Sequence, residues 1–119
     1  MRSAACRHGD PGDVWAVALD PSVANEQRGT RPCLVISSDG FNALPIRRAF
    51  VVPLTTRDRG FPHHVAVQDD GGLDRSSWAM WEAARAVSTQ RFGRYVSTAS
   101  ATCVDRVAWQ LASWLSGQT

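Results

Sequence analysis

The sequence contains no lysine: all thirteen of its basic residues are arginine. Its eleven acidic residues reduce the formal net charge to +2. This excludes a polycation, so any nucleic-acid contact would depend on a local basic patch. A coding bias toward arginine would by itself explain the absence of lysine. Arginine nevertheless presents a planar fork of donors that matches phosphate and stays charged at any relevant pH, so a local patch would suit a phosphate-bearing partner.

The chain also lacks long apolar runs, internal repeats and a cysteine framework. No stretch approaches the roughly 20 apolar residues that cross a bilayer. The N-terminal arginines are not followed by the apolar segment of a signal peptide. Only three cysteines occur, unevenly spaced, which is typical of a reduced cytoplasm rather than of a disulfide scaffold. We therefore expect a cytoplasmic protein without a membrane segment.

Length and composition indicate one globular domain. With 119 residues, 44% of them apolar and 20% charged, the chain can enclose a single core. Residues 1–11 show no periodicity, and we expect them to form a flexible arm ahead of a domain over 12–119. Cys6, His8 and Asp10 alternate within that arm but lack a fourth ligand, so we predict no metal site.

Short runs of apolar and β-branched residues, bounded by glycine, proline and aspartate, predict a mainly β protein. Two of these runs, 13–19 and 49–54, are apolar on both faces, as strands inside a barrel or between layers are. Further strands are expected over 31–37, over 64–68, within 76–87 and, as a small strand, over 94–97. A short helix is expected over 38–44. These elements suggest a small, strongly bent antiparallel sheet or barrel with helices attached.

The clearest predicted element is a helix over 98–116. Apolar residues recur there at three- and four-residue steps and so share one helix face. They are Val104, Val107, Ala108, Leu111 and Leu115. Ser100 or Thr102 can cap the start of this helix. Trp109 falls on the polar side, where it is either a surface residue or a protein contact.

The connection over 20–30, between the first two expected strands, is long and polar. A hairpin needs only about two to five residues, so a connection of this length carries extra closure entropy and is a candidate for function. It contains Glu26 and Arg28, and Arg31 follows at its exit, held in an extended conformation by Pro32. An ordinary solvated loop with a surface ion pair is the alternative.

Several short motifs follow one another in a fixed order. They are GDVW at 12–15, EQRGTRP at 26–32, LVIS at 34–37, VPLTT at 52–56 and GLDRSS at 72–77. In this order and spacing the chain resembles the MazF/PemK family of toxin endoribonucleases. The resemblance implies an SH3-like barrel of about five to seven antiparallel strands plus a C-terminal helix, acting as a homodimer. It also implies cleavage of single-stranded RNA, whether messenger, ribosomal or transfer RNA, without a metal or other cofactor. A small antitoxin would neutralise the toxin by lying across the active groove.

By position, the resemblance implies that Arg31 and Thr55 are the catalytic arginine and threonine, and that Glu26 is the acidic residue of the loop. The 2′-OH of the RNA would attack the phosphorus, giving a 2′,3′-cyclic phosphate and a 5′-OH. Arg31 would stabilise the charge on the phosphoryl oxygens, Thr55 would donate to one of them, and Glu26 would act as base or orient Arg31. Further RNA contacts are expected from Arg28, Thr56, Arg57, Arg59, Phe61, Glu82 and Arg85.

The chain also departs from the family pattern. Glu82 and Arg85 are kept, but Ala83 replaces a glutamine, and Trp78 and Trp81 replace small aliphatic residues. The resemblance therefore does not predict the cleavage sequence. For these two tryptophans and for Trp15, burial and base stacking are both open, with burial favoured.

The role of the two adjacent histidines is open as well. Histidine is a common general acid or base, but the neighbours His63 and His64 would point to opposite faces of a strand, so at most one would face the site.

Three other functions compete with the ribonuclease. A related CcdB-like toxin inhibits a protein target with the same barrel. A catalytically silent homologue would act by protein binding alone, and a generic SH3-like adaptor would need no arginine beside a long polar loop. The combination of Glu26, Arg31 and Thr55 favours the ribonuclease, since a pure inhibitor need not keep it.

Overall fold

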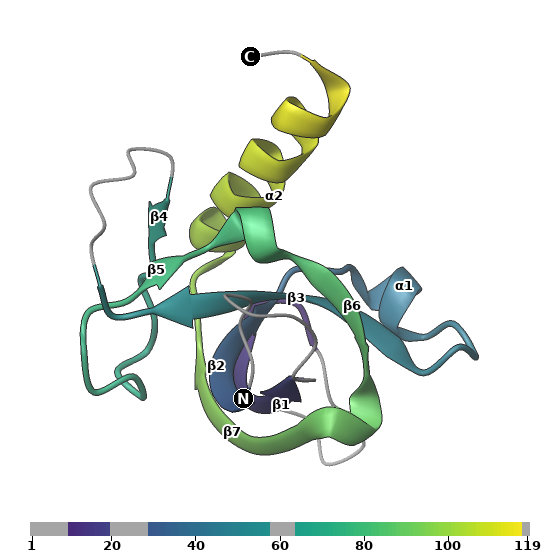
Figure 1. Cartoon of the computed structure of the whole chain (residues 1–119), viewed down its shortest axis with the longest axis horizontal. Coiled ribbons are helices and arrows are strands. Elements are labelled where there is room, and N and C mark those ends of the chain that lie inside the picture. The colour runs from purple at the N-terminus through teal and green to yellow at the C-terminus, as the bar shows by residue number, and fades with distance from the viewer. Residues whose placement is uncertain (1–9, 20–28, 58–63, 118–119) are drawn as a thin grey trace.

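The computed structural model describes residues 10–19, 29–57 and 64–117, and its main element is a strongly bent antiparallel sheet (Figure 1). The seven strands of the described residues are β1 (Asp13–Leu19), β2 (Gly29–Val35), β3 (Arg48–Thr55), β4 (Val65–Ala66), β5 (Trp78–Ala79), β6 (Arg85–Ser88) and β7 (Phe92–Thr98). Their order is β4-β5-β3-β2-β1-β7, and β6 pairs with β3 off that path. In Figure 1, β3, β6, β7, β1 and β2 trace a ring.

Four helices complete the described structure: α1 (Asp39–Asn42), η1 (Trp81–Ala83), η2 (Thr89–Arg91) and α2 (Ala101–Ser116). The predicted fold class, mainly β with a C-terminal helix, is confirmed. No helix in the described ranges is long and apolar enough to cross a bilayer. The arm predicted over 1–11 lies almost wholly outside the described residues.

The strand predictions hold best where both faces are apolar. β1 spans the predicted residues, and β3 extends the predicted strand by one residue at each end. The strand predicted over 64–68 is shorter, because the chain leaves β5 after β4. Gln68 there accepts a hydrogen bond from the Ser100 backbone at 2.9 Å, and Asp69 bridges to Ala99. These bonds tie the segment to the start of α2 instead.

Two apolar clusters occupy the two sides of the bent sheet. One lies against α2 and contains Val14, Leu34, Val52, Leu54, Val65, Ala79, Trp81, Ala99, Cys103 and Val107. The other contains Trp15, Val17, Leu19, Cys33, Val35, Ala49, Val51, Val87 and Phe92. We call the second group the ring cluster, because its members come from the strands that trace the ring in Figure 1. Alternate residues of one strand therefore enter different clusters, which explains why these strands are apolar on both faces.

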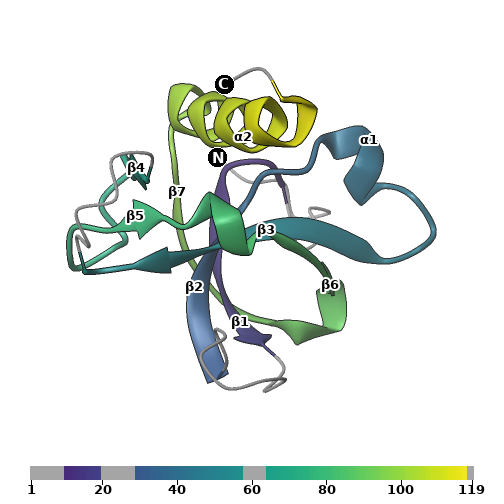
Figure 2. The same ribbon diagram turned by 45° about the horizontal axis from the view of Figure 1, so that its top comes forward.

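The C-terminal helix has the caps that the sequence predicts. The Ser100 side chain accepts a hydrogen bond from the Cys103 backbone at 3.1 Å, and Gly117 ends the helix in the left-handed conformation. The prediction that Leu115 belongs to the buried face is wrong, since it is 79% exposed. Figures 1 and 2 show the reason: α2 crosses the sheet, and its last turn projects beyond it. Trp114 instead stacks on Trp81, with ring centroids 6.1 Å apart.

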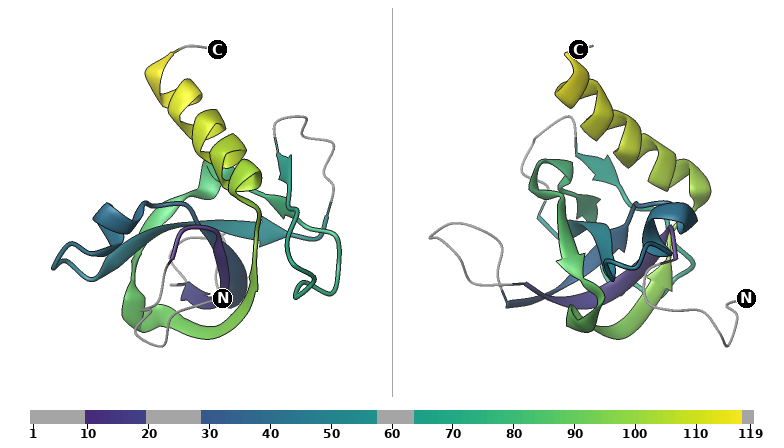
Figure 3. Two further views of the ribbon diagram at one scale, coloured as in Figure 1. Left: turned by 180° about the vertical axis from the view of Figure 1, so that it is seen from behind. Right: turned by 90° about the vertical axis from the view of Figure 1, so that its right-hand side faces the viewer.

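A tight loop between β4 and β5 packs against β7. The Asp70 backbone donates to the Thr98 carbonyl at 3.0 Å, and Asp69 Oδ2 accepts from the Leu73 backbone at 3.0 Å. A Cβ on Gly72 would lie 2.1 Å from the Val96 carbonyl oxygen. Only glycine therefore permits this approach. In the left view of Figure 3 the same loop lies at the β4–β5 end of the sheet, away from β6.

Candidate active site at the end of β3

Arg31 lies on β2, and its side chain reaches across to β3. The hydrogen-bonded ladder between these strands starts with Cys33 opposite Pro53. Beyond that pair, Arg31 Nη1 donates to the Leu54 carbonyl oxygen at 3.3 Å. This oxygen belongs to the peptide bond that joins Leu54 to Thr55. The contact uses one of several guanidinium donors, so the half-buried group is held against the end of β3 with donors left for an anion.

Thr55 ends β3 and is 6% exposed. Its Oγ1 accepts a hydrogen bond from the Arg57 backbone at 3.1 Å. A hydroxyl that accepts one bond still has its own proton to donate. Thr56 and Arg57, both predicted RNA contacts, follow directly and are exposed. The strand end therefore presents a fixed hydroxyl beside an exposed arginine.

Arg85 lies on the same side of the sheet as Arg31 and Thr55. It stands opposite Val51 on β3, and residues directly opposite each other in a sheet point to the same face. The thiol of Cys33 supports this placement. Burial raises its pKa to about 12, while the charges of Arg85 and Arg31 both lower it. The charges of two of the predicted arginines thus both reach the buried Cys33 sulfur of the ring cluster.

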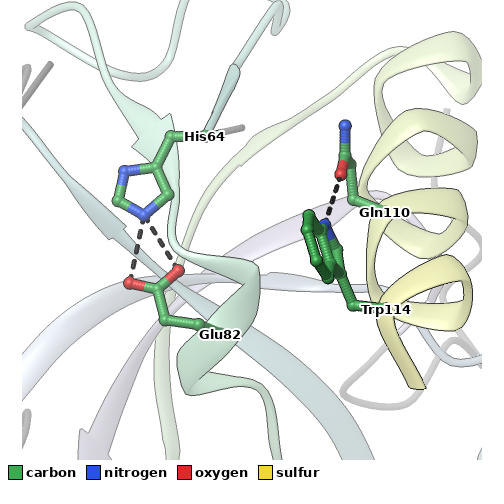
Figure 4. Close-up of polar contacts among 4 residues, drawn as sticks. All are labelled: His64, Glu82, Gln110 and Trp114. Carbon is green, nitrogen blue, oxygen red and sulfur yellow. Dashed lines mark hydrogen bonds and ion pairs between the residues drawn. The ribbon is translucent and has the colours of Figure 1, made fainter. Parts of the chain in front are cut away.

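Glu82 contacts a histidine rather than standing alone. His64 Nε2 lies 2.8 Å from Glu82 Oε1 and 3.0 Å from Oε2 (Figure 4). The His64 side chain is 5% exposed and that of Glu82 is 45% exposed. The carboxylate therefore stays accessible to a ligand while the imidazole is fixed. The sequence leaves the role of His64 open and does not predict this pair.

The other predicted site residues lie outside the described ranges. They are Glu26, Arg28, Arg59, Phe61 and the neighbouring His63. The structure thus places Arg31, Thr55 and Arg85 on one side of the sheet, and the functional roles of all the predicted site residues remain predictions.

The aromatic residues proposed for base stacking have structural roles in part. Trp15 is 9% exposed and packs on Phe92 and Tyr95, with both pairs of ring centroids 5.7 Å apart. Trp81 is 8% exposed within the cluster under α2. Burial is therefore confirmed for these two. Trp78, directly opposite Thr55, is half-buried and lies closest in register to the site.

A guanidinium and a hydroxyl held at one peptide bond suit a phosphoryl group, whose oxygens accept from both. Within the described ranges, no group of three or more His, Cys, Asp or Glu side chains is placed to hold a metal ion. The fold and this site define a small, mainly β protein whose central strand ends beside an arginine and a hydroxyl, a combination suited to phosphate esters.

Comparison with known proteins narrows this class. The family model described as a PemK-like, MazF-like toxin of type II toxin-antitoxin systems matches residues 10–115. Endoribonuclease PemK of Escherichia coli is 31% identical over 112 residues, covering 88% of this chain and 80% of that protein. Endoribonuclease EndoA of Bacillus subtilis is 30% identical over 98 residues, covering 81% and 84%. The crystal structure of MazF from Deinococcus radiodurans is 26% identical and superposes with a TM-score of 0.78, covering 90% of this chain and 96% of that one. The chain belongs to the PemK/MazF toxin family.

Proposed function

We propose that this chain is the toxin of a toxin–antitoxin pair and cleaves single-stranded RNA by attack of the ribose 2′-OH. The observation that supports the proposal most directly is the hydrogen bond from the Arg31 guanidinium to the Leu54 carbonyl, which holds it beside Thr55 at the end of β3. The relatives' names, PemK and EndoA endoribonucleases, agree with it.

The reaction needs no covalent enzyme intermediate. The 2′-oxygen bonds to phosphorus as the bond from phosphorus to the 5′-oxygen breaks, which leaves a 2′,3′-cyclic phosphate and a 5′-OH. A base takes the 2′-OH proton, and the departing 5′-oxygen gains one. The pentacoordinate phosphorus carries extra negative charge, which Arg31 and Thr55 are placed to stabilise.

Arg31 acts through charge rather than proton transfer, because a guanidinium does not give up its proton in the accessible pH range. We assign the base to Glu26, which precedes β2 in the sequence. Since a guanidinium takes the role that a bound cation would fill, cleavage should persist in EDTA.

The family consists of toxins of type II toxin-antitoxin systems. We propose that this toxin is a homodimer and that a small antitoxin covers its site. Messenger RNA, or single-stranded parts of ribosomal or transfer RNA, would be cut in the cytoplasm once the antitoxin is removed.

The test is to incubate purified, antitoxin-free protein with a long RNA in EDTA and to map the new 5′ ends. We expect 5′-OH ends at one recurrent short sequence, with a rate about 10²–10³-fold lower for Arg31→Ala. Arg94→Ala, which removes an exposed arginine of β7, is the matched control and should cut like the wild type.

Intact RNA with folded wild-type protein would refute the proposal and leave the CcdB-like inhibitor and the silent homologue. Equal cleavage by Arg31→Ala would show that the arginine is not catalytic. A topoisomerase assay on the same sample separates the inhibitor from the silent homologue.

A further inference from the structure

A second basic site lies where β6 pairs with β3, beyond the site at the end of β3. A cavity of about 200 Å³ opens there. Its lining residues are Arg48, Arg85, Ala86, Val87, Ser88 and Arg91. We call this cavity the arginine pocket. Its described lining includes three arginines and no acidic side chain, and neither Arg48 nor Arg91 belongs to the family motifs in the sequence.

Three separate elements bring these arginines together. Arg48 stands opposite Ser88 in the β3–β6 ladder, and Arg85 stands opposite Val51. Their side chains therefore leave opposite faces of the ladder, and both border the cavity. Arg91 follows on η2, which turns the chain away from β6, and its Nη1 donates to the Ala18 carbonyl at 3.4 Å. The pocket thus depends on strand pairing and a turn rather than on flexible side chains alone.

The backbone around Arg48 is also fixed. Arg47, just before β3, has a φ of 56°, a left-handed conformation that non-glycine residues seldom adopt. The Thr89 backbone donates to the Arg47 carbonyl at 3.0 Å and so joins η2 to the start of β3. This bond holds the segments that carry Arg48 and Arg91 next to each other.

The chemistry of the pocket favours an anion. Arginines that line one cavity favour a bound anion, because each guanidinium can donate hydrogen bonds to its oxygens in a bidentate way. The Ser88 hydroxyl, which accepts from the Gln90 backbone at 3.2 Å, can still donate its proton. The cavity is smaller than the roughly 300–1,000 Å³ of typical small-molecule sites. It therefore suits a single phosphate group better than a whole nucleotide.

We propose that the arginine pocket binds a backbone phosphate of the RNA strand, a few nucleotides away from the cleaved bond. This inference rests on the proposed ribonuclease function. Arg85 links the two sites. It lines the pocket, and its charge, like that of Arg31, lowers the pKa of the Cys33 thiol. Val51, its partner on β3, precedes Thr55 by four residues, which is roughly 13 Å along a strand. An extended RNA strand covers that distance within a few nucleotides.

Binding is measured with an RNA whose cleavage nucleotide carries a 2′-deoxyribose, so that it cannot be cut. The variants are Arg48→Ala, Arg91→Ala and the double variant. The matched control is Arg75→Ala, an exposed arginine in the loop between β4 and β5, away from β6 (Figure 1). We expect the slope of log Kd against log salt concentration to fall by about 0.7 for each phosphate that the protein no longer neutralises. The affinity should fall several-fold, with the cleavage sequence and the single-turnover rate at saturation unchanged.

A second comparison uses RNAs shortened from either end. Shortening on one side of the cut should remove the difference between wild type and double variant, and shortening on the other side should not. Circular dichroism checks folding, and Arg48→Gln and Arg91→Gln replace any alanine variant that unfolds.

Several results would overturn the inference. If Arg75→Ala lowers the salt slope as much as the pocket variants do, the effect is general charge. If the pocket variants bind RNA as the wild type does but bind an acidic antitoxin peptide more weakly, the pocket is an antitoxin site. In both cases RNA cleavage by the wild type would leave the proposed function intact. If the wild type neither binds nor cuts RNA, both proposals fail.

Discussion

Replacing Thr55 by valine separates the proposed catalytic role of this residue from its structural role. Valine keeps the branched shape of threonine but removes the hydroxyl. Thr55→Ser is the opposite control, because serine keeps the hydroxyl and removes the methyl group. Since Thr55 is 6% exposed at the end of β3, both variants test the same buried position.

The structure indicates how large each effect should be. In the valine variant the Arg57 backbone N–H has no acceptor in place of Thr55 Oγ1, which lies 3.1 Å away in the wild type, and this should cost about 0.5–1.5 kcal/mol of unfolding free energy. Arg57 is exposed, so water can replace the acceptor and the cost should stay at the lower end. Loss of a donor to the phosphoryl oxygen should cost more, about 10²–10³-fold in rate. The serine variant should be roughly 1 kcal/mol less stable for want of the methyl group but should keep most of the rate.

Thr55→Val should therefore lose mainly cleavage rate, and Thr55→Ser should lose mainly stability. Urea unfolding gives the stability, and single-turnover cleavage of an RNA with one site, at saturating protein, gives the rate. If the cleavage rate of Thr55→Val is within about threefold of the wild-type rate, the hydroxyl does not act in the transition state. If Thr55→Ser cleaves as slowly as Thr55→Val, the rate depends on the methyl group, and Thr55 acts by packing.

The parts of the fold that the sequence predicts well are those whose signal is local. β1 and α2 follow from uninterrupted apolar runs and from three- and four-residue spacing, and both are found where predicted. β4 is not predicted correctly, because its length depends on bonds that Gln68 and Asp69 make with the segment before α2. No pattern within residues 64–68 shows that such distant partners compete with β5.

The candidate site divides in the same way. Arg31 and Thr55 are identified by motifs, and the structure adds that Arg31 donates to the Leu54 carbonyl, directly before Thr55. His64 and Glu82 are 18 residues apart and pair only because η1 turns the chain after β5. Arg48 becomes part of a pocket only because the β3–β6 register places it opposite Ser88. Register is a property of the paired strands, so a single sequence does not reveal it.

Two further predictions test the packing around the site. Gly72→Ala should destabilise the protein by about 3 kcal/mol, because the new Cβ would lie 2.1 Å from the Val96 carbonyl oxygen. Gly40→Ala, whose nearest neighbour would be 3.8 Å away, should be close to neutral in the same urea titrations, and equal losses of stability would contradict the reasoning. Cys33 tests the polarity of the ring cluster, because burial raises its thiol pKa from 9.0 to about 12. Between these values the native state keeps a proton that the unfolded chain has released, so this contribution is complete below pH 9 and disappears as the pH rises toward 12. Relative to Cys33→Ala, the unfolding free energy of the wild type should fall by about 1.4 kcal/mol per pH unit in that window. A difference between the two proteins that does not change with pH would show that the thiol is already solvated in the folded barrel.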